Sequence, residues 1–357
     1  MSIINPCFLL SKNLILIFLG IFGIGFIIGF HELGHFLFSK LFRVNVPAFA
    51  IGFGPKLFKK QIGETKFSLG AIPLGGYVET NRESFDSKPY YQKMLVIGGG
   101  IAFNLLFAYF VFCLLFMLGL PKTRFLYATT TTPKIEAVTK DAQSLGIKPG
   151  DKIVNIDGKE VKGETKIVLQ QLKESKNNTV KLKLSRVGQL VDLQLDKKKF
   201  LQALGTFKIS FKYVDRPGLP LFQAIKKGIQ FTNAYIYMSV MMFKNMLVKR
   251  DTSGVGGPVM IIAATMQSAA QGLKVFLLLL ALISISLAIL NLIPLPILDG
   301  GQALLYTIEA IIRKPLSEKI KEYIFIASWI FMLALFVLIS FRDIWRLFGL
   351  AKFFGGK

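Results

Sequence analysis

The chain has 357 residues, 52% of them hydrophobic, and its mean hydropathy is +0.52. These values exclude an ordinary soluble protein and predict a polytopic α-helical membrane protein with at least one polar insert. The formal net charge is +23, and the lysines and arginines crowd the loops beside the apolar segments, as the positive-inside rule and attraction to anionic lipids require. Because no nucleic-acid-binding module is visible, we expect anionic membrane lipids as partners and no nucleic acid.

The first apolar segment, residues 14 to 37, contains the motif His31-Glu32-Leu33-Gly34-His35. Ionisable side chains are costly at membrane depth and need a functional or pairing reason. On a helix, the two histidines project from one face at the spacing of two Zn²⁺ ligands, with Glu32 beside them as general base. Both histidines of the chain lie in this motif, which disfavours an ordinary buried histidine. Two ligands fill half of a zinc shell, so a third protein ligand is required.

Residues 1–120 are predicted to form the first half of a membrane core, with spans at 14–37 and 94–120. No small-residue cleavage site follows the first span, so we expect it to be retained and not removed as a signal peptide. The second span opens with Gly98-Gly99-Gly100, which favours close helix packing over a phosphate cradle. Asn104, inside this span, is expected to cap or tether a neighbouring backbone.

The polar connection between these spans, residues 45–93, is rich in lysine and is therefore placed on the cytoplasmic side. Within it, residues 66–79 have the pattern of a β-hairpin, with a Pro/Gly turn between two strands. Gly75 and Gly76 permit close backbone approach near the metal motif. Two interpretations stay open here: an ordinary surface hairpin, or a strand edge that holds an extended substrate by strand addition.

Residues 121–217 have the composition of a small soluble domain. Two β segments at 145–161, a helix at 164–173 and a hairpin built from 180–186 and 190–195 predict an α+β fold. The run LGIKPGDKIVNIDGKEV at 145–161 resembles the signature of a PDZ domain, a module that binds extended peptides by adding a strand to its sheet. Because this insert follows the second span, we expect a PDZ-like domain on the extracytoplasmic side.

Residues 218–272 are predicted to hold an amphipathic helix at 229–248, lying on the outer membrane surface, and a Gly-rich connection at 253–258. Residues 273–357 are predicted to form the second half of the membrane core. Its spans lie at 273–292 and 323–340, which gives four transmembrane helices in all.

The third span ends in Asn291-Leu292-Ile293-Pro294-Leu295-Pro296-Ile297-Leu298-Asp299-Gly300-Gly301. The prolines and glycines would unwind the helix, which is tolerated at membrane depth where the backbone lines a cavity. Asp299 could complete a His₂Asp zinc shell and leave the fourth position for water. It could instead cap the next helix, and the local pattern alone leaves both open. The incomplete zinc shell at His31 and His35 favours the ligand.

The number of spans supplies a test of this assignment. The first span places His31 and His35 towards its cytoplasmic end, and Asp299 reaches the same depth if the third span also runs inward. A further span at 229–248 would put Asp299 at the opposite face of the membrane. For that reason we assign 229–248 to the surface.

Several motifs in order along nearly the whole chain resemble those of the site-2 protease family of M50-type intramembrane zinc metalloproteases, in the branch related to regulator of sigma-E protease. The matching stretches are HELGH, IPLGGYV, SKPYYQKMLVIGGGIAFNLLFA, the PDZ-like signature and NLIPLPILDGG. By position, the resemblance implies that His31, His35 and Asp299 bind one Zn²⁺ and that Glu32 is the catalytic base. It also implies that Asn291 contacts the scissile backbone.

The same resemblance implies a metalloendopeptidase of a bacterial cytoplasmic membrane, with its active site towards the cytoplasm. Expected substrates are single-span membrane proteins, such as anti-sigma factors already shortened by another protease, or remnant signal peptides. Three departures from the family pattern remove no ligand: one PDZ-like domain in place of two, Ile101 in place of a proline, and Gln302 after the LDGG sequence.

Two other functions fit the sequence less well. A catalytically inactive scaffold that displays the PDZ-like domain is disfavoured by the intact His-Glu-His and Asp set. A zinc or proton-coupled transporter would need further polar residues along the spans and an internal repeat, and neither is visible in the sequence.

Overall fold

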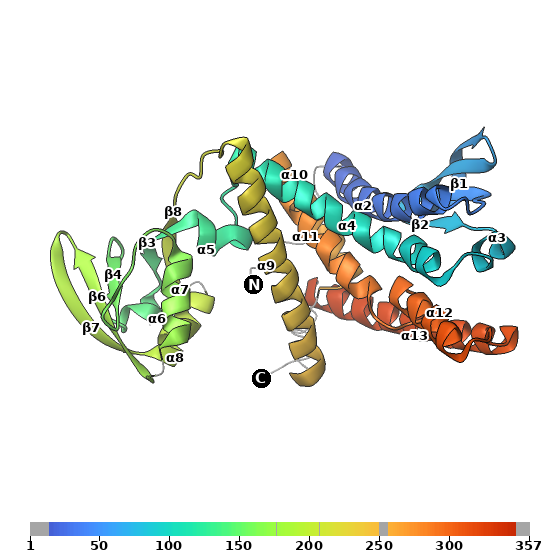
Figure 1. The fold of residues 1–357 in the computed structure, drawn as a ribbon. Helices are drawn as coiled ribbons and strands as arrows, with labels where there is room; N and C mark the ends of the chain where they lie inside the picture. Colours follow the sequence, from blue (N-terminus) through green and yellow to red (C-terminus); the bar gives the residue numbers. More distant parts are fainter. Residues whose placement is uncertain (1–13, 176, 207, 250–255, 348–357) are drawn as a thin grey trace. The chain divides into compact units, whose positions relative to one another are not determined.

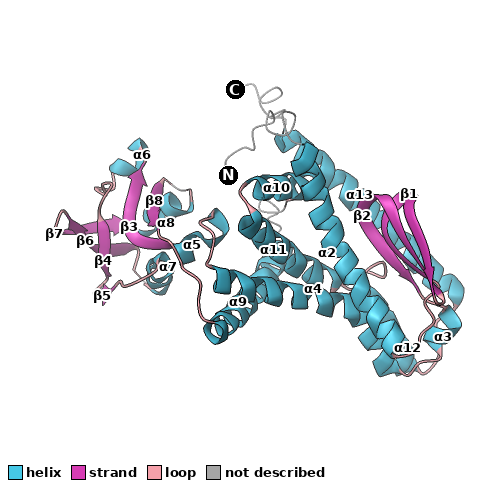
Figure 2. Ribbon diagram, turned by 90° about the horizontal axis from the view of Figure 1, so that it is seen from above, coloured by secondary structure: helices cyan, strands magenta, loops and turns pink. Residues whose placement is uncertain are grey.

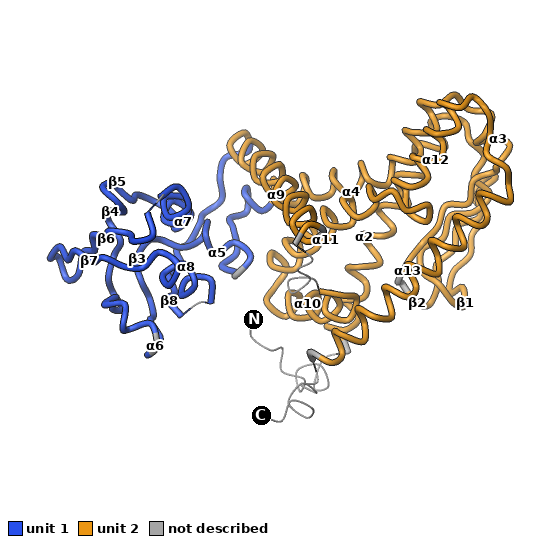
Figure 3. Tube along the Cα trace, turned by 90° about the horizontal axis from the view of Figure 1, so that it is seen from below, with its two compact units in different colours: residues 1, 115–221 blue, residues 2–114, 222–357 orange. Residues whose placement is uncertain are grey.

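The structure is a computed structural model that describes residues 14–175, 177–206, 208–249 and 256–347. The chain divides into two compact units, shown in two colours in Figure 3. Unit 1 comprises residues 115–221, and unit 2 comprises residues 2–114 and 222–357. Unit 1 therefore contains the stretch 121–217 that the sequence sets apart by its composition.

Unit 2 is mostly helical, and within the described residues four of its helices are long and apolar enough to cross a membrane. They are α2 (Leu14–Leu41), α4 (Tyr90–Leu118), α11 (Leu273–Asn291) and α13 (Glu318–Leu347), all labelled in Figure 1. The predicted set of four apolar helices is thus confirmed. Helices α2, α4 and α13 each begin before or end after the apolar stretch from which they were predicted. A helix can continue past the hydrocarbon region because its backbone hydrogen bonds stay intact there.

Two further helices of unit 2 lie between unit 1 and α11 in the sequence. Helix α9 (Leu221–Lys249) includes the predicted surface stretch 229–248 and is not among the four candidate spans. It packs against α4, where the rings of Phe112 and Phe231 lie 4.9 Å apart. Helix α10 (Pro258–Ala270) was not predicted. Residues 253–255, which are part of the expected Gly-rich connection, lie outside the described residues.

Helix α10 packs tightly against the first half of α2. A Cβ atom added at Gly20 would lie 2.7 Å from the Met266 side chain and 3.2 Å from its backbone nitrogen. The missing side chain at Gly20 is therefore what allows the close approach. The connection predicted at 218–272 thus contributes a helix that packs against the one carrying the HELGH motif.

A sheet follows α2 directly, made of β1 (Ala48–Ile62) and β2 (Thr65–Glu79). Residues 48–51 pair with 66–69 and also with 76–79, so the start of β1 lies between two parts of β2. The hairpin predicted within 66–79 is therefore wrong: residues 65–79 form the single strand β2, and the tight turn lies at residues 63–64, between β1 and β2. Because of Lys56, Lys59 and Lys60, the sequence of β1 resembles a polar loop. In the structure most residues in this part of β1 are exposed, so the strand can contain polar side chains.

Two shorter helices, one of them preceded by a non-helical segment, are also part of unit 2 (Figure 2). Helix α3 (Arg82–Asp86) comes directly after β2 and has Asn81 as its N-cap, whose side chain accepts a hydrogen bond from the Ser84 backbone. Residues 292–298 are not helical, as their two prolines predict, and α12 (Asp299–Ile312) begins immediately after them.

Unit 1 is built around a six-stranded sheet with the path β7-β6-β4-β3-β8, and β5 pairs with β4. Its strands are β3 (Thr131–Val138), β4 (Lys152–Ile156), β5 (Lys159–Glu160), β6 (Thr179–Arg186), β7 (Gln189–Asp196) and β8 (Ile209–Tyr213). Its helices are η1 (Arg124–Leu126), α5 (Tyr127–Thr130), α6 (Lys140–Gln143), α7 (Thr165–Glu174) and α8 (Lys197–Gly205). Buried aliphatic and phenyl side chains of the strands and of α7 and α8 form one core, with Phe200 and Phe211 among the largest.

The helix and the hairpin predicted from the sequence pattern of residues 121–217 lie within one residue of their expected positions. Helix α7 covers the predicted helix at 164–173, and the β6–β7 hairpin covers 180–186 and 190–195. The sequence did not indicate β3, α8 or β8, and β8 forms the edge of the sheet next to β3. The strongest local signal for α8 is its N-cap Asp196, whose side chain accepts a hydrogen bond from the Lys199 backbone.

A partly buried ion pair holds the loop at residues 146–151 of unit 1. The Asp151 side chain is fully buried and accepts hydrogen bonds from Arg186 Nε (2.8 Å), Arg186 Nη2 (2.9 Å) and the Lys148 backbone N–H (2.8 Å). Burial alone would raise the pKa of Asp151, but the bonds from Arg186 and Lys148 outweigh it and hold the pKa below its usual value.

We therefore expect the fold of unit 1 to lose stability in acid. The Asp151 carboxylate is ionised in both folded and unfolded chains above its unfolded pKa of about 3.9. Its stabilisation is complete there and is lost as the pH falls from about 4 through the lower pKa of the folded state. Hydrogen exchange of residues 147–156 in the intact chain, corrected for intrinsic rates, should accelerate between neutral pH and about pH 3. The Asp151→Asn variant should exchange faster at neutral pH and lose this part of the pH dependence. An unchanged profile in that variant would contradict the assignment.

Candidate metal centre

Helix α2 carries the two histidines on one face, one turn apart. His31 Nε2 and His35 Nε2 lie 3.1 Å apart, and the two ring planes are inclined by 80°. Side chains at positions i and i+4 of a helix lie one above the other, so the sequence spacing alone produces this pairing. His31 is buried, with 7% of its surface exposed, although it lies on a helix whose composition is that of a membrane span.

Asp299 approaches the same point from α12. Its Oδ2 atom lies 3.3 Å from His31 Nε2, and its Oδ1 atom lies 3.5 Å from His35 Nε2. Asp299 is the first residue of α12, while the N-cap is Leu298 and makes no side-chain cap hydrogen bond. The capping role left open by the sequence is therefore not what the carboxylate does in this structure. It faces the two histidines.

The non-helical turn before Asp299 packs against two glycines at the start of α12, Gly300 and Gly301. A Cβ atom added at Gly300 would collide with the backbone of Leu292 and Ile293, and one at Gly301 with the backbone of Leu295 and Pro296. The chain after α11 thus folds back tightly against the start of α12. This close packing sets the position of the Asp299 backbone relative to the end of α11.

The three side chains fit a zinc ion. Ligand atoms that each lie about 2 Å from a tetrahedral centre are about 3.3 Å from one another. Here the two Nε2 atoms lie 3.1 Å apart, with one Asp299 carboxylate oxygen 3.3 Å from that of His31 and the other oxygen 3.5 Å from that of His35. The Asp299 Oδ2 atom is buried and makes no hydrogen bond within the described part of the chain. A buried carboxylate oxygen without a donor is costly unless it is paired or binds a metal. The donor set therefore suits Zn²⁺.

Helix α4 closes one side of this cluster through its glycines. Cβ atoms added at Gly34 of α2 or at Gly99 of α4 would each collide with the backbone of the other residue, so the two helices touch at this pair. One residue further on, a Cβ atom at Gly100 would lie 2.6 Å from His31 Nε2 and would also collide with His35 Nε2. The Gly-Gly-Gly run is therefore a site of close helix packing, as the sequence indicated, and it also leaves room for the imidazoles.

The same helix supplies hydrogen-bond partners for both rings. His35 Nδ1 lies 2.9 Å from the Val96 carbonyl oxygen, and His31 Nδ1 lies 3.0 Å from the side-chain amide of Asn104. The expectation that the Asn104 side chain caps or tethers a backbone is wrong, because it contacts an imidazole. Sequence reasoning missed Val96 and Gly100 as parts of the site. The signal for Asn104 was present, since it is a polar residue deep in an apolar helix.

Glu32 lies beside the second part of β2. A Cβ atom added at Gly76 would lie 2.9 Å from Glu32 Cγ and 2.9 Å from the Ala50 carbonyl oxygen, so a glycine is needed for the strand to pass the glutamate. Gly75 has a φ of 105°, a backbone conformation that favours glycine. These two glycines are the ones that the sequence singled out for close backbone approach.

A cavity of about 1070 Å³ is lined by all of the site residues that the sequence predicted. Its lining includes His31, Glu32, His35, Asp299, Asn291, Gly75 and Gly76. The structure therefore brings together every residue predicted for the site, at the boundary between α2, β2 and the turn after α11. Asn291 is the last residue of α11 and is buried, with 7% of its surface exposed.

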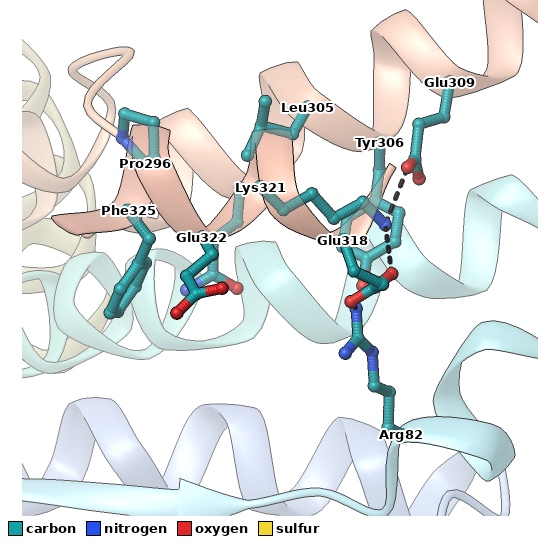
Figure 4. Close-up of a pocket in the computed structure, with 10 residues that line it drawn as sticks. Arg82, Pro296, Leu305, Tyr306, Glu309, Glu318, Lys321, Glu322 and Phe325 are labelled. Carbon is teal, nitrogen blue, oxygen red and sulfur yellow. Dashed lines mark ion pairs between the residues drawn. The ribbon is translucent and has the colours of Figure 1, made fainter. Parts of the chain in front are cut away.

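A second cavity of about 520 Å³ adjoins the first and shares Arg82, Gln302, Tyr306 and Phe325 with its lining. Figure 4 shows Arg82 reaching Glu318 (2.5 Å), while Lys321 lies between Glu309 (2.7 Å) and Glu318 (4.0 Å). Burial, together with the Asp86 carboxylate, raises the pKa of Tyr306, whose hydroxyl donates to that carboxylate at 3.2 Å. These contacts join the segment after β2 to α12 and α13.

Comparisons with known proteins agree with this site. The model of the family described as Peptidase family M50 matches residues 19–335. A protein of Clostridium perfringens named "Putative zinc metalloprotease" is 32% identical over 88% of this chain and 94% of its own length. Proteins of the same name from Fusobacterium nucleatum and Clostridium acetobutylicum are 31% and 30% identical, over 91% and 92% of this chain and 97% of their own lengths. With a family match across most of its length, four helices that could cross a membrane and a His-His-Asp cluster between them, this chain belongs to Peptidase family M50.

Proposed function

We propose that the chain is an intramembrane zinc metalloprotease that hydrolyses peptide bonds within or near the transmembrane segments of single-span membrane proteins. The observation that carries the proposal is the cluster of His31, His35 and Asp299 at the mutual distances of zinc ligands, next to Glu32. The cluster lies on an apolar helix of membrane length. A soluble zinc enzyme would have no need to carry its metal ligands on an apolar helix of membrane length.

In this proposal His31, His35 and Asp299 hold one Zn²⁺ per chain. When bound, zinc lowers the pKa of water towards neutrality and polarises a carbonyl group. Glu32 takes the proton from the attacking water and returns it to the nitrogen of the departing amine, so that the peptide bond is replaced by a carboxylate and an amine. Asn291, which lines the cavity, donates from its amide to the oxygen on which negative charge develops.

The edge of β2 is suited to hold the substrate. A helical transmembrane segment hides its amide groups in hydrogen bonds and must unwind before water can attack. Residues 76–79 pair with 48–51 on one side, and in the described part of the chain no strand other than β1 pairs with them. An extended substrate could add as a strand along this edge, with Gly75 and Gly76 leaving space beside Glu32.

The expected substrates are anti-sigma factor-like proteins or remnant signal peptides, which would make this a step in regulated intramembrane proteolysis. The expected location is a bacterial cytoplasmic membrane, with the metal centre towards the cytoplasm and the PDZ-like unit 1 on the other side. There, unit 1 would bind peptide or exclude bulky substrates. The lysine-rich loops support binding to anionic lipid headgroups.

The test uses the purified intact chain in lipid vesicles. We expect about one zinc ion per chain, as a single His₂Asp site implies, and cleavage of a model single-span segment at a bond inside its apolar stretch. A chelator should abolish cleavage, and zinc should restore it. Zinc binding without cleavage of any single-span segment would favour a scaffold that displays unit 1, and a chain without zinc would overturn the proposal.

A further inference from the structure

Asn104 has an unusual position for a polar residue in an apolar helix. Its side chain is fully buried, and its amide nitrogen Nδ2 lies 3.0 Å from His31 Nδ1. Its own backbone carbonyl accepts a hydrogen bond from Ser284 Oγ of α11 at 2.8 Å, which fixes this turn of α4 against a second helix. One end of the side-chain amide, the oxygen, makes no hydrogen bond within the described part of the chain.

The chemistry of a ligand histidine decides what its second nitrogen needs. When a neutral imidazole binds a metal through Nε2, the proton is on Nδ1, and Nδ1 requires an acceptor. His35 has such an acceptor in the Val96 carbonyl oxygen at 2.9 Å. His31 has the Asn104 amide at the equivalent place, so an acceptor for His31 must come from this side chain.

An amide side chain can meet this need with its oxygen. In the structure the NH₂ end of the amide faces Nδ1, and beside a protonated Nδ1 this orientation would set donor against donor. Turning the amide by half a revolution exchanges its two ends and brings the oxygen to Nδ1. The unpartnered amide oxygen and the protonated Nδ1 are complementary. Together they form one hydrogen bond, whereas apart they leave two buried polar groups unsatisfied, which is costly.

We propose that Asn104 is a positioning residue that accepts a hydrogen bond from the Nδ1–H of His31 and so directs Nε2 towards the metal. This inference rests on the proposed function, because it presupposes a metal on Nε2. Asn104 does not touch the substrate or the metal in this role. It fixes the tautomer and the ring orientation of one ligand, as the Val96 carbonyl does for the other.

The test compares zinc affinity in the intact purified protein, measured by competition with a chromophoric chelator. Asn104→Leu keeps a similar volume but has no acceptor, and we expect its zinc dissociation constant to rise by about 10- to 100-fold. Asn104→Asp retains an acceptor and should bind zinc nearly as tightly as the unmodified chain. The absorption spectrum of the cobalt-substituted protein should change in Asn104→Leu and be preserved in Asn104→Asp, a signature that a purely structural role would not produce.

Asn233→Leu is the matched control, because it removes a hydrogen bond between Asn233 of α9 and Tyr109 of α4 without touching a histidine. It should leave zinc affinity unchanged. If Asn104→Leu does not fold, Asn104→Ala repeats the comparison with a smaller side chain. The proposal is overturned if a folded acceptor-free variant binds zinc as tightly as the unmodified chain, or if folded Asn104→Asp loses as much affinity as Asn104→Leu. Failure of the proposed function would look different, since the unmodified chain would then bind no zinc or cleave nothing.

Discussion

Replacing Glu32 with glutamine is expected to lower the cleavage rate by about 10²- to 10⁴-fold, the usual contribution of a general acid–base residue. Glutamine has the same shape as glutamate, so it fits beside Gly76 without new contacts. It cannot take a proton from water at neutral pH. Zinc content should stay unchanged, because His31, His35 and Asp299 form the cluster without Glu32. Metal analysis and cleavage of a single-span segment, both on the purified variant, measure the two effects separately.

The matched control is Glu64→Gln, the same substitution at an exposed position in the turn between β1 and β2. It should leave both zinc and cleavage as they are. If Glu32→Gln retained full cleavage, Glu32 could not be the base. If cells that carry Glu32→Gln handled their membrane proteins normally, the inactive scaffold would become the better description. Membrane proteins that accumulate in Glu32→Gln cells, but not in Glu64→Gln cells, would be candidate substrates.

The sequence predicted the helical part of this fold well, for a physical reason. A membrane span is a local feature, because every backbone group must be satisfied within the segment and most side chains must be apolar. The pairing of His31 with His35 is local as well, since it follows from the helix period. Even Asp299 could be proposed from composition, as a lone acid beside two prolines in an apolar stretch.

Features that depend on contacts between distant segments were predicted less well. Strand β1 reads as a loop because its lysines and its exposed positions hide the period of a strand. Helix α10 reads as a connection, since its thirteen residues are too few for a span. The tether expected of Asn104 was wrong in its partner. A polar residue in a span predicts that some hydrogen bond exists, while the identity of the partner depends on which helix faces it.

The glycines of α4 illustrate the same limit. The run Gly98-Gly99-Gly100 predicts close packing, but it does not say which glycine faces what. In the structure the three differ sharply: a Cβ atom at Gly98 would meet nothing within 4 Å, one at Gly99 would meet the backbone of α2, and one at Gly100 would meet the imidazoles. Only the assembled helices distinguish them.

Because Gly100 is the glycine that faces the imidazoles, Gly100→Ala is expected to abolish zinc binding while the chain still folds. The added methyl group would lie 2.6 Å from His31 Nε2 and collide with His35 Nε2, well inside the usual separation of about 3.5 Å between non-bonded atoms. The obstacle is a pair of side chains and not backbone, so the rings can turn away and α4 can keep its place. Alanine also favours a helix over glycine by about 1 kcal/mol, which opposes any general loss of stability.

Turning the rings moves both Nε2 atoms away from Asp299. A displacement of about 1 Å at a reacting centre can cost about 100-fold in rate, and two displaced ligands should also release the metal. We therefore expect purified Gly100→Ala to contain little zinc and to lose at least about 100-fold of its cleavage rate. Thermal unfolding of unit 1 should be unchanged, because none of its residues is altered.

Gly98→Ala separates this local effect from any general effect of alanine in α4. It makes the same chemical change two residues away, gains the same helix propensity and meets open space. It should keep its zinc and its cleavage. Equal loss in both variants would mean that α4 cannot accept a methyl group anywhere in this run, and full zinc in Gly100→Ala would mean that the metal lies elsewhere. Loss in Gly100→Ala alone would place the zinc where His31, His35 and Asp299 converge, against the glycine face of α4.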